Sequence, residues 1–385
     1  MGKISAANPL FLDHLATTPL VPEVVEAMAP YLTAPNNAPL QGNKLHSIRT
    51  LDHARQQVAE LIGAKPDEVI FTSGATEANN MALKGLQNQP RHILTTAIEH
   101  SAILEPLRQL EAEGSKVTLI PLEANGRVNL EAFKSQIAET KPDLVTVQAT
   151  NNEIGSRQPV AEIGRICAKN GIIFHIDAAQ GVIGQELDFK ETGAHMMSLS
   201  AHKIYGPQGI GALIVRRDIT LNPLLHGGGQ QYALRPGTPP VALISGFGTA
   251  AAICSKHKKH DLNHLKTLKN AFLHILNTTE GLDFQLHSEN NENTHPGLIS
   301  LAFGTIPAES IFAQTPELVL ATGAACNDAL GKPSHVLKAL GLRPDQIQAT
   351  IRIGLGRYVT KAQTIEAANI LVQGVERVMR NNVSP

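Results

Sequence analysis

The chain has 385 residues, of which 42% are hydrophobic and 17% charged, and a formal net charge of -1 at pH 7. This balance lacks the basic patch of a nucleic-acid binder, so no nucleic-acid partner is expected. Three scattered cysteines form neither a CxxC pair nor a disulfide framework, which favours a cytoplasmic protein. We expect neither secretion nor membrane insertion, because there is no signal-peptide pattern and no run approaches the roughly 20 apolar residues that span a bilayer.

Short apolar runs alternate with amphipathic stretches between Asp67 and Arg216, a pattern typical of βαβ units. Strands are predicted at residues 68–71, 92–96, 116–122, 144–150, 172–177, 195–200 and 210–216. The stretches between them, such as ATEANNMALKGL and VAEIGRICAKN, repeat apolar residues at helical spacing. The sequence therefore predicts an α/β fold with a mainly parallel seven-stranded sheet and helices on both faces.

The last third of the chain predicts a smaller α+β domain. A long helix is expected over 241–276 and a final helix over 361–379. Because the chain exceeds the usual size of one hydrophobic core, we expect a large domain over 14–248 and a small domain built from 1–13 and 249–385. No repeat or linker-like tract separates the two, so they should pack closely.

The segment after the first strand is a candidate phosphate site. Ligands of open α/β sheets bind at the carboxyl ends of the strands. There the sequence TSGAT, residues 72–76, leads into a helix whose N-terminal amides could hold a phosphate. The segment is neither a Walker loop nor a GxGxxG, which argues against a nicotinamide dinucleotide. Taken alone, it is explained equally well by a helix cap at Thr72 or Ser73.

Polar side chains follow four further strands. Asp177 ends IIFHID, and Lys203 precedes the glycine-rich turn YGPQGIG. His100 and Asn152 follow the strands at 92–96 and 144–150. A desolvated lysine is nucleophilic toward an aldehyde, and a buried carboxylate needs a partner such as a cationic ring nitrogen. Singly, each residue is more often a cap, a turn or a surface residue, but five strands that deliver polar groups to one rim favour a catalytic site.

Segments along nearly the whole chain carry a family resemblance. SAHKIYGPQGIGAL and HIDAAQ are the most specific, and they are joined by LDHLATTPL, FTSGATEANNMALKG, EHSAIL, NNEIG, HGGGQQYALRPGT, GAACNDALGKPSHVLKALG and IRIGLGR. Together they resemble the NifS/IscS-like cysteine desulfurases, class-V aminotransferase-family enzymes of fold-type I. The resemblance implies the cofactor pyridoxal 5'-phosphate and conversion of L-cysteine to L-alanine. It also implies a persulfide whose sulfur passes to an acceptor protein for iron-sulfur cluster assembly or thiolation.

The resemblance also implies roles for individual residues at the cofactor. Lys203 would carry it as a Schiff base and remove the substrate Cα proton, Asp177 would pair with the protonated ring nitrogen, and His100 would stack on the ring and assist proton transfer. Further contacts would come from Gly74, Ala75, Thr76, Asn152, Gln180, Ser200 and His202. Thr238 would reach the phosphate of a neighbouring subunit, which implies a homodimer.

Substrate binding and sulfur transfer are assigned by the same resemblance. Arg352, in IRIGLGR, would hold the substrate carboxylate in a bidentate fork, with Asn152 beside it. Cys326, in GAACND, would take the sulfur as a thiolate. The other cysteines, Cys167 and Cys254, lie in apolar helical stretches and are expected to be packing residues.

Several alternatives remain open at this stage. The cysteine loop reads ATGAACND where desulfurases usually carry serines, and RPGT replaces RSGT. Both variants resemble selenocysteine lyases, so L-selenocysteine is the alternative substrate. Another class-V reaction, such as transamination or kynureninase-like cleavage, would make Cys326 merely structural. A catalytically silent scaffold for partner binding would lack the cofactor's colour.

No metal site is expected. His260 and His264 are spaced to share a helix face, but no HExxH or clustered Cys/His set accompanies them. Their neighbours Lys258, Lys259 and Asp261 predict a solvated surface.

Overall fold

The computed structural model describes residues 4–33, 41–86, 91–323 and 333–383. Within them, seven strands form one sheet in the order β2-β8-β7-β6-β5-β3-β4. They are β2 (Val69–Thr72), β3 (His92–Thr95), β4 (Lys116–Leu119), β5 (Leu144–Gln148), β6 (Ile173–Asp177), β7 (Met196–Ser200) and β8 (Gly211–Val215). β8 runs antiparallel to both of its neighbours, and the remaining pairings are parallel. The predicted mainly parallel seven-stranded sheet is confirmed.

Six of the seven strands are shorter than predicted: β4 by three residues, β5 and β8 by two, and β3, β6 and β7 by one, while β2 keeps its length but lies one residue later. β4 was expected to reach residue 122 but ends at Leu119, which is in register with Thr95, the last residue of β3, and Leu122 instead forms an isolated bridge with Val128. β5 was expected to reach residue 150 but ends at Gln148. Thr150 instead forms an isolated bridge with Arg157.

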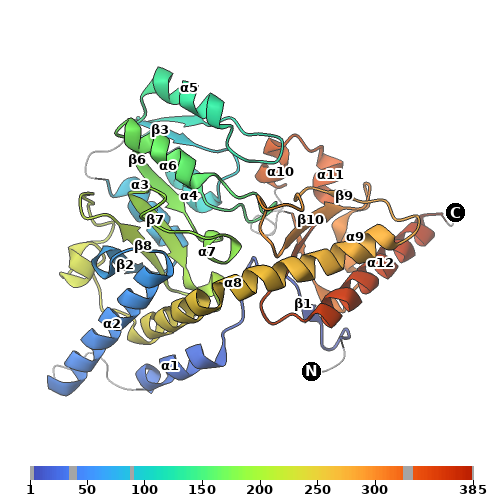
Figure 1. Cartoon of the computed structure of the whole chain (residues 1–385), viewed down its shortest axis with the longest axis horizontal. Helices are drawn as coiled ribbons and strands as arrows, with labels where there is room; N and C mark the ends of the chain where they lie inside the picture. Colours follow the sequence, from blue (N-terminus) through green and yellow to red (C-terminus); the bar gives the residue numbers. More distant parts are fainter. Residues whose placement is uncertain (1–3, 34–40, 87–90, 324–332, 384–385) are drawn as a thin grey trace.

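Helices cover both faces of this sheet (Figure 1). On one face lie α3 (Ala75–Lys84) and α4 (Ser101–Ala112), and on the other lie α2 (Gln41–Leu61), α5 (Leu130–Thr140), α6 (Val160–Lys169) and the first half of α8 (Val241–Thr278). Each face of the sheet packs against its helices in a separate hydrophobic core. Consecutive residues of a strand enter different cores, since side chains alternate along a strand. Ile70 packs with α3 and α4, whereas Phe71 packs with α2 and α8.

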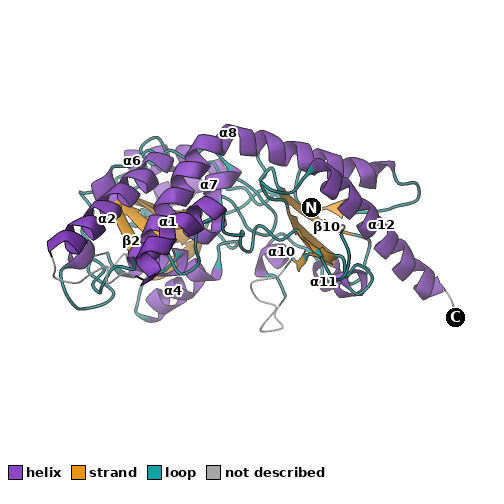
Figure 2. Cartoon of the chain, turned by 90° about the horizontal axis from the view of Figure 1, so that it is seen from below, coloured by secondary structure: helices purple, strands orange, loops and turns teal. Residues whose placement is uncertain are grey.

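A second, antiparallel sheet stands beside the first (Figure 2). Its order is β12 (Ala321–Thr322), β13 (Thr350–Gly354), β10 (Leu298–Ala302) and β9 (Gln285–Leu286). The predicted long helix and final helix are confirmed as α8 and α12 (Lys361–Val383). α8 packs in the first core up to Cys254 and in the second from Leu265 onward.

Shorter elements complete the described chain. They are β1 (Leu10–Phe11) paired with β11 (Leu318–Val319), the helices α1 (Pro22–Thr33), α7 (Gly181–Gly184), α9 (Ala308–Phe312), α10 (His335–Ala339) and α11 (Pro344–Ala349), and the 3-10 turns η1 (Pro66–Glu68), η2 (Ala201–Lys203) and η3 (Gln230–Ala233). None of the described helices is long and apolar enough to cross a membrane.

The middle of α8 corrects one prediction. His260 and His264 do share a helix face, with ring centroids 6.0 Å apart. Asp261 is not solvated, however, because it is only 3% exposed and pairs with Arg357 across a Nε to Oδ2 distance of 2.9 Å. The described residues contain no group of three or more His, Cys, Asp or Glu that could hold a metal ion.

Candidate active site

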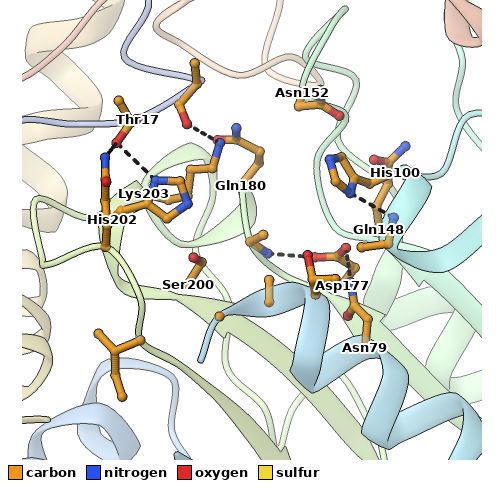
Figure 3. A pocket seen from close by; sticks show the side chains of 18 of the residues that line it. Thr17, Asn79, His100, Gln148, Asn152, Asp177, Gln180, Ser200, His202 and Lys203 are labelled. Atoms are coloured by element: carbon orange, nitrogen blue, oxygen red, sulfur yellow. Dashed lines mark hydrogen bonds between the residues drawn. The ribbon is translucent and has the colours of Figure 1, made fainter. Parts of the chain in front are cut away.

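A cavity of about 540 Å³ lies at the carboxyl edge of the seven-stranded sheet (Figure 3). Ten of the residues proposed from sequence line it: Gly74, Ala75, Thr76, His100, Asn152, Asp177, Gln180, Ser200, His202 and Lys203. They come from the segments that follow β2, β3, β5, β6 and β7, because these five strands end on the same edge. The convergence of five strand ends on one site is confirmed.

The N-terminus of α3 forms one wall of the cavity. The N-cap residue is Gly74, and no side chain in the described part of the chain caps the helix there. The Thr72 hydroxyl donates to the Gly74 carbonyl instead (2.9 Å), so the alternative of a cap by Thr72 or Ser73 is wrong. A Cβ on Gly211 would lie 2.7 Å from the Gly74 backbone, which requires glycine where β8 passes this turn. The open helix end suits an anion such as a phosphate.

Asp177 lies at the cavity floor, where it ends β6 at 5% exposure. Its Oδ2 accepts from Asn79 Nδ2 (2.7 Å), and its Oδ1 accepts from the Ala179 N–H (3.0 Å). Among the described residues, no ion pair includes Asp177, and Asn79 Oδ1 is buried without a hydrogen-bond partner. A buried carboxylate held by neutral donors is suited to a cation that a ligand supplies.

Lys203 is held at the cavity by an N-terminal segment. Its Nζ donates to the carbonyls of Leu15 and Ala16, the latter at 2.8 Å, and Gln180 Nε2 also donates to Leu15. The Thr18 hydroxyl donates to the carbonyl of His202 (2.8 Å). Sequence analysis missed this segment as part of the site. Its only signal was LDHLATTPL, because backbone carbonyls do the binding.

His100 is the N-cap of α4. Its Nδ1 accepts from the Ala102 N–H (3.0 Å), so the proton of the neutral ring is on Nε2. Burial lowers the pKa of His100, Asp177 acts in the opposite direction, and Lys203 and His335 lower it further. The ring is therefore a neutral imidazole with an N–H to donate.

Two predicted residues, Arg352 and Thr238, do not line the cavity, and a third lies where the structure makes no description. Arg352, on β13, is 1% exposed and lies beside the rim, where its Nη1 donates to the Asn152 carbonyl (3.2 Å) and its Nη2 to Asp13 (2.8 Å). Thr238 is exposed outside the cavity. Cys326 lies outside the described residues.

Several lining residues were absent from the predicted site. They are Thr17, Asn79, Gln148 and Gln208, among others. Asn79 carried the clearest signal, since an amide at a buried helical position needs a polar partner. Gln148 gave no such signal, since it lies in a strand predicted from its apolar residues Leu144, Val145 and Val147.

Comparisons with known proteins agree with this geometry. The family model for aminotransferase class-V matches residues 10–366. A protein named cysteine desulfurase IscS from Rickettsia bellii is 39% identical over 381 residues, covering 96% of this chain and 92% of its own. A solved NifS-like protein superposes with a TM-score of 0.88 at 29% identity, covering 96% of this chain and all of its own. A structure of SspA in complex with cysteine has a TM-score of 0.78 at 33% identity, covering 91% of this chain and 99% of its own.

These matches span both sheets and the whole cavity. The chain therefore belongs to the class-V aminotransferase family, among its NifS/IscS-like cysteine desulfurases.

Proposed function

We propose that this protein is a pyridoxal-phosphate-dependent cysteine desulfurase, which converts L-cysteine to L-alanine and transfers the sulfur to Cys326. The observation that carries this proposal is the arrangement around one cavity. Lys203, a buried Asp177 and the uncapped N-terminus of α3 lie together there, in a chain of this family. L-selenocysteine remains the alternative substrate.

The residues present fit the cofactor. Gly74, Ala75, Thr76, Ser200 and His202 would hold its phosphate. Asp177 would pair with the ring nitrogen, Asn152 and Gln180 would contact the phenolic oxygen, His100 would lie on the ring, and Lys203 would bind the aldehyde carbon. When bound, pyridoxal phosphate supplies an electron sink that acidifies the substrate Cα–H.

The chain's own residues would then move protons and sulfur. Lys203, held toward the cavity by the carbonyls of Leu15 and Ala16, would take the Cα proton. His100 would assist proton transfer by donating the proton on its Nε2. The Cys326 thiolate would bond to the substrate sulfur as the carbon–sulfur bond breaks, and alanine would leave once Cβ has gained a proton.

Cys326 is also favoured because the two described cysteines cannot do its work. Burial raises the pKa of Cys167 to about 12 and that of Cys254 to about 11, so neither is a thiolate at neutral pH. Both are free thiols packed in the core, which supports a reducing compartment such as the cytoplasm.

Arg352 is proposed to bind the substrate carboxylate, with Asn152 beside it. Two of its nitrogens are occupied by Asn152 and Asp13, while its Nε is buried without a hydrogen-bond partner among the described residues. An incoming carboxylate would satisfy that donor. The relative described as SspA in complex with cysteine supports a ligand of this size.

Arg352→Lys is expected to raise the KM for L-cysteine about 10- to 100-fold and to change kcat far less, since a lysine loses the planar fork of donors. Steady-state alanine formation measures both constants, and circular dichroism checks that the variant folds. An unchanged KM would show that the carboxylate binds elsewhere.

Cys326→Ala is expected to lower alanine formation from L-cysteine about 100-fold or more while L-selenocysteine is still processed, because selenium leaves more readily without a thiol acceptor. Cys167→Ala is the control and should keep both activities. If Cys326→Ala still forms alanine from L-cysteine at the normal rate, Cys326 is structural. Wild-type activity on L-selenocysteine alone would favour a selenocysteine lyase.

We also propose the quaternary and domain organisation. Thr238 would reach the phosphate site of a second subunit in a homodimer. Its exposure supports this, as do the anchors of the preceding loop, where Arg235 Nε donates to Glu77 (2.9 Å). Residues 14–248 would form the large domain, and 1–13 with 249–385 the small domain. An acceptor protein would take the sulfur for iron-sulfur cluster assembly or thiolation.

A further inference from the structure

Glu99 is a buried carboxyl group to which the reaction described above gives no role. It directly precedes His100 in the turn between β3 and α4 and is 0% exposed. Its Oε1 lies 2.6 Å from Thr96 Oγ1, and its Oε2 accepts from the Gln148 N–H (2.8 Å). It does not line the catalytic cavity.

The turn that carries Glu99 is tied down on several sides. The Ile98 carbonyl accepts from Gln148 Nε2 (2.6 Å) and from Asn151 Nδ2 (3.0 Å). His335, on α10, donates a hydrogen bond from Nε2 to the Glu99 carbonyl (2.8 Å). The backbone immediately before His100 is thus fastened to the end of β5 and to α10. The Glu99 side chain adds a second tie to β5.

The surroundings of Glu99 already contain one buried carboxylate. Gln148, which donates to Glu99, lies opposite Asp177 in the β5–β6 register. Asp177 is the charged group that acts on Glu99, while Asp177, Lys203 and His335 act on the adjacent His100. None of the ion pairs among the described residues includes Glu99 or Asp177. A bound cofactor would bring one cationic ring nitrogen, and that nitrogen would pair with Asp177 and not with Glu99.

A second negative charge here would remain without a partner. Taking an unpaired carboxylate out of water costs several kcal/mol. Burial, together with the charge of Asp177, raises the pKa of Glu99 well above its ordinary value. The two hydrogen bonds are compatible with the acid form, since Oε1 can carry a proton donated to Thr96 Oγ1 while Oε2 accepts from the Gln148 N–H.

We propose that Glu99 is a positioning residue that is held as the neutral carboxylic acid and fixes the turn on which His100 approaches the cofactor. This inference rests on the proposed function for its kinetic consequence but not for the protonation state. Glutamine has the same shape as the neutral acid, with an amide N–H for Thr96 and an oxygen for Gln148. Alanine has neither.

The kinetic test compares Glu99→Gln with Glu99→Ala in the holoenzyme. Glu99→Gln is expected to keep kcat within about twofold. Glu99→Ala should lower kcat about 100-fold with little change in KM, because His100 would no longer be held in position. In a His100→Ala background, Glu99→Ala should add almost nothing further. The pH midpoint of the cofactor's visible absorbance should be the same in Glu99→Gln as in the wild type.

Two kinetic outcomes would overturn the inference. If Glu99→Gln loses as much activity as Glu99→Ala and also shifts the absorbance midpoint, the negative charge is what matters. If Glu99→Ala keeps kcat, or is fully additive with His100→Ala, Glu99 does not act through His100.

A second measurement decides the protonation state without any activity. A carboxyl group whose pKa is raised in the folded state weakens folding progressively as pH rises from the unfolded-state pKa toward the folded-state pKa. The ratio of folding constants, Glu99→Gln over wild type, should therefore grow by up to about tenfold per pH unit between pH 5 and 8. Glu68→Gln, at another buried glutamate that accepts a backbone N–H, is the matched control.

A ratio that stays flat for Glu99→Gln, or falls with pH, would show an ionised Glu99 and overturn the inference. If the wild type forms no alanine from L-cysteine, the proposed function fails. This folding comparison still decides whether Glu99 is neutral.

Discussion

Lys203→Ala is expected to lower alanine formation from L-cysteine by at least about 10³-fold, because the same amine binds the cofactor and accepts the substrate proton. The structure gives the physical reason. Nζ reaches the cavity and is aimed by two backbone carbonyls, those of Leu15 and Ala16. No second lysine lines the cavity among the described residues to replace it.

The measurement is alanine by chromatography, together with the visible spectrum of the purified protein before and after borohydride. In the wild type, borohydride should reduce the Schiff base, remove the yellow colour and leave the cofactor covalently attached to the protein. In Lys203→Ala, borohydride should attach no cofactor. Lys190→Ala removes an exposed lysine outside the cavity and should leave both readouts unchanged. A coloured, active Lys203→Ala protein would contradict the assignment of the cofactor lysine.

Asp177→Asn is expected to lower kcat by about 10²- to 10³-fold while the protein still binds the cofactor. The amide keeps the size of the side chain and its place beside Asn79, but it cannot stabilise a protonated ring nitrogen. The loss should therefore appear in the proton-abstraction step, with little effect on KM. Stopped-flow absorbance with L-cysteine, compared with L-cysteine deuterated at Cα, identifies that step.

Asn79→Ala is the matched control for Asp177. It removes the 2.7 Å hydrogen bond to Oδ2 but leaves the negative charge, so its effect should be much smaller than that of Asp177→Asn. Equal losses in the two variants would show that the hydrogen bond, not the charge, matters at this position.

Much of the sheet could be predicted from sequence, because its strands follow from short-range patterns, and these patterns together with the family resemblance pointed to ten of the residues that line the cavity. Ile70 and Phe71 pack into the hydrophobic cores on opposite faces of the sheet, so consecutive residues of β2 are both apolar and the strand is visible in the sequence as an apolar run. Asp177 stood out because a carboxylate at the end of an apolar strand requires a partner, and Lys203 stood out because it follows a strand that ends on the same edge as the phosphate-site candidate and Asp177. Once the strands were placed, topology alone brought these residues to one edge.

The parts that could not be predicted depend on contacts distant in sequence. Leu15 and Ala16 bind Lys203 through carbonyls, which leave no side-chain signal. Asp261 lies in a charged stretch of α8, and only its pairing with Arg357 shows that it is buried. The protonation state proposed for Glu99 depends first on its complete burial and then on the charge of Asp177, which lies 78 residues further along the chain.

The most direct test of the central claim is the fate of the sulfur atom in a single turnover. The purified protein is mixed with one equivalent of L-cysteine and alkylated, and its peptides are analysed by mass spectrometry while alanine is quantified. The account predicts one alanine for each persulfide sulfur, carried on the peptide that contains Cys326. Pyruvate and ammonia in place of alanine, or alanine with elemental sulfur in solution and no persulfide on that peptide, would contradict it.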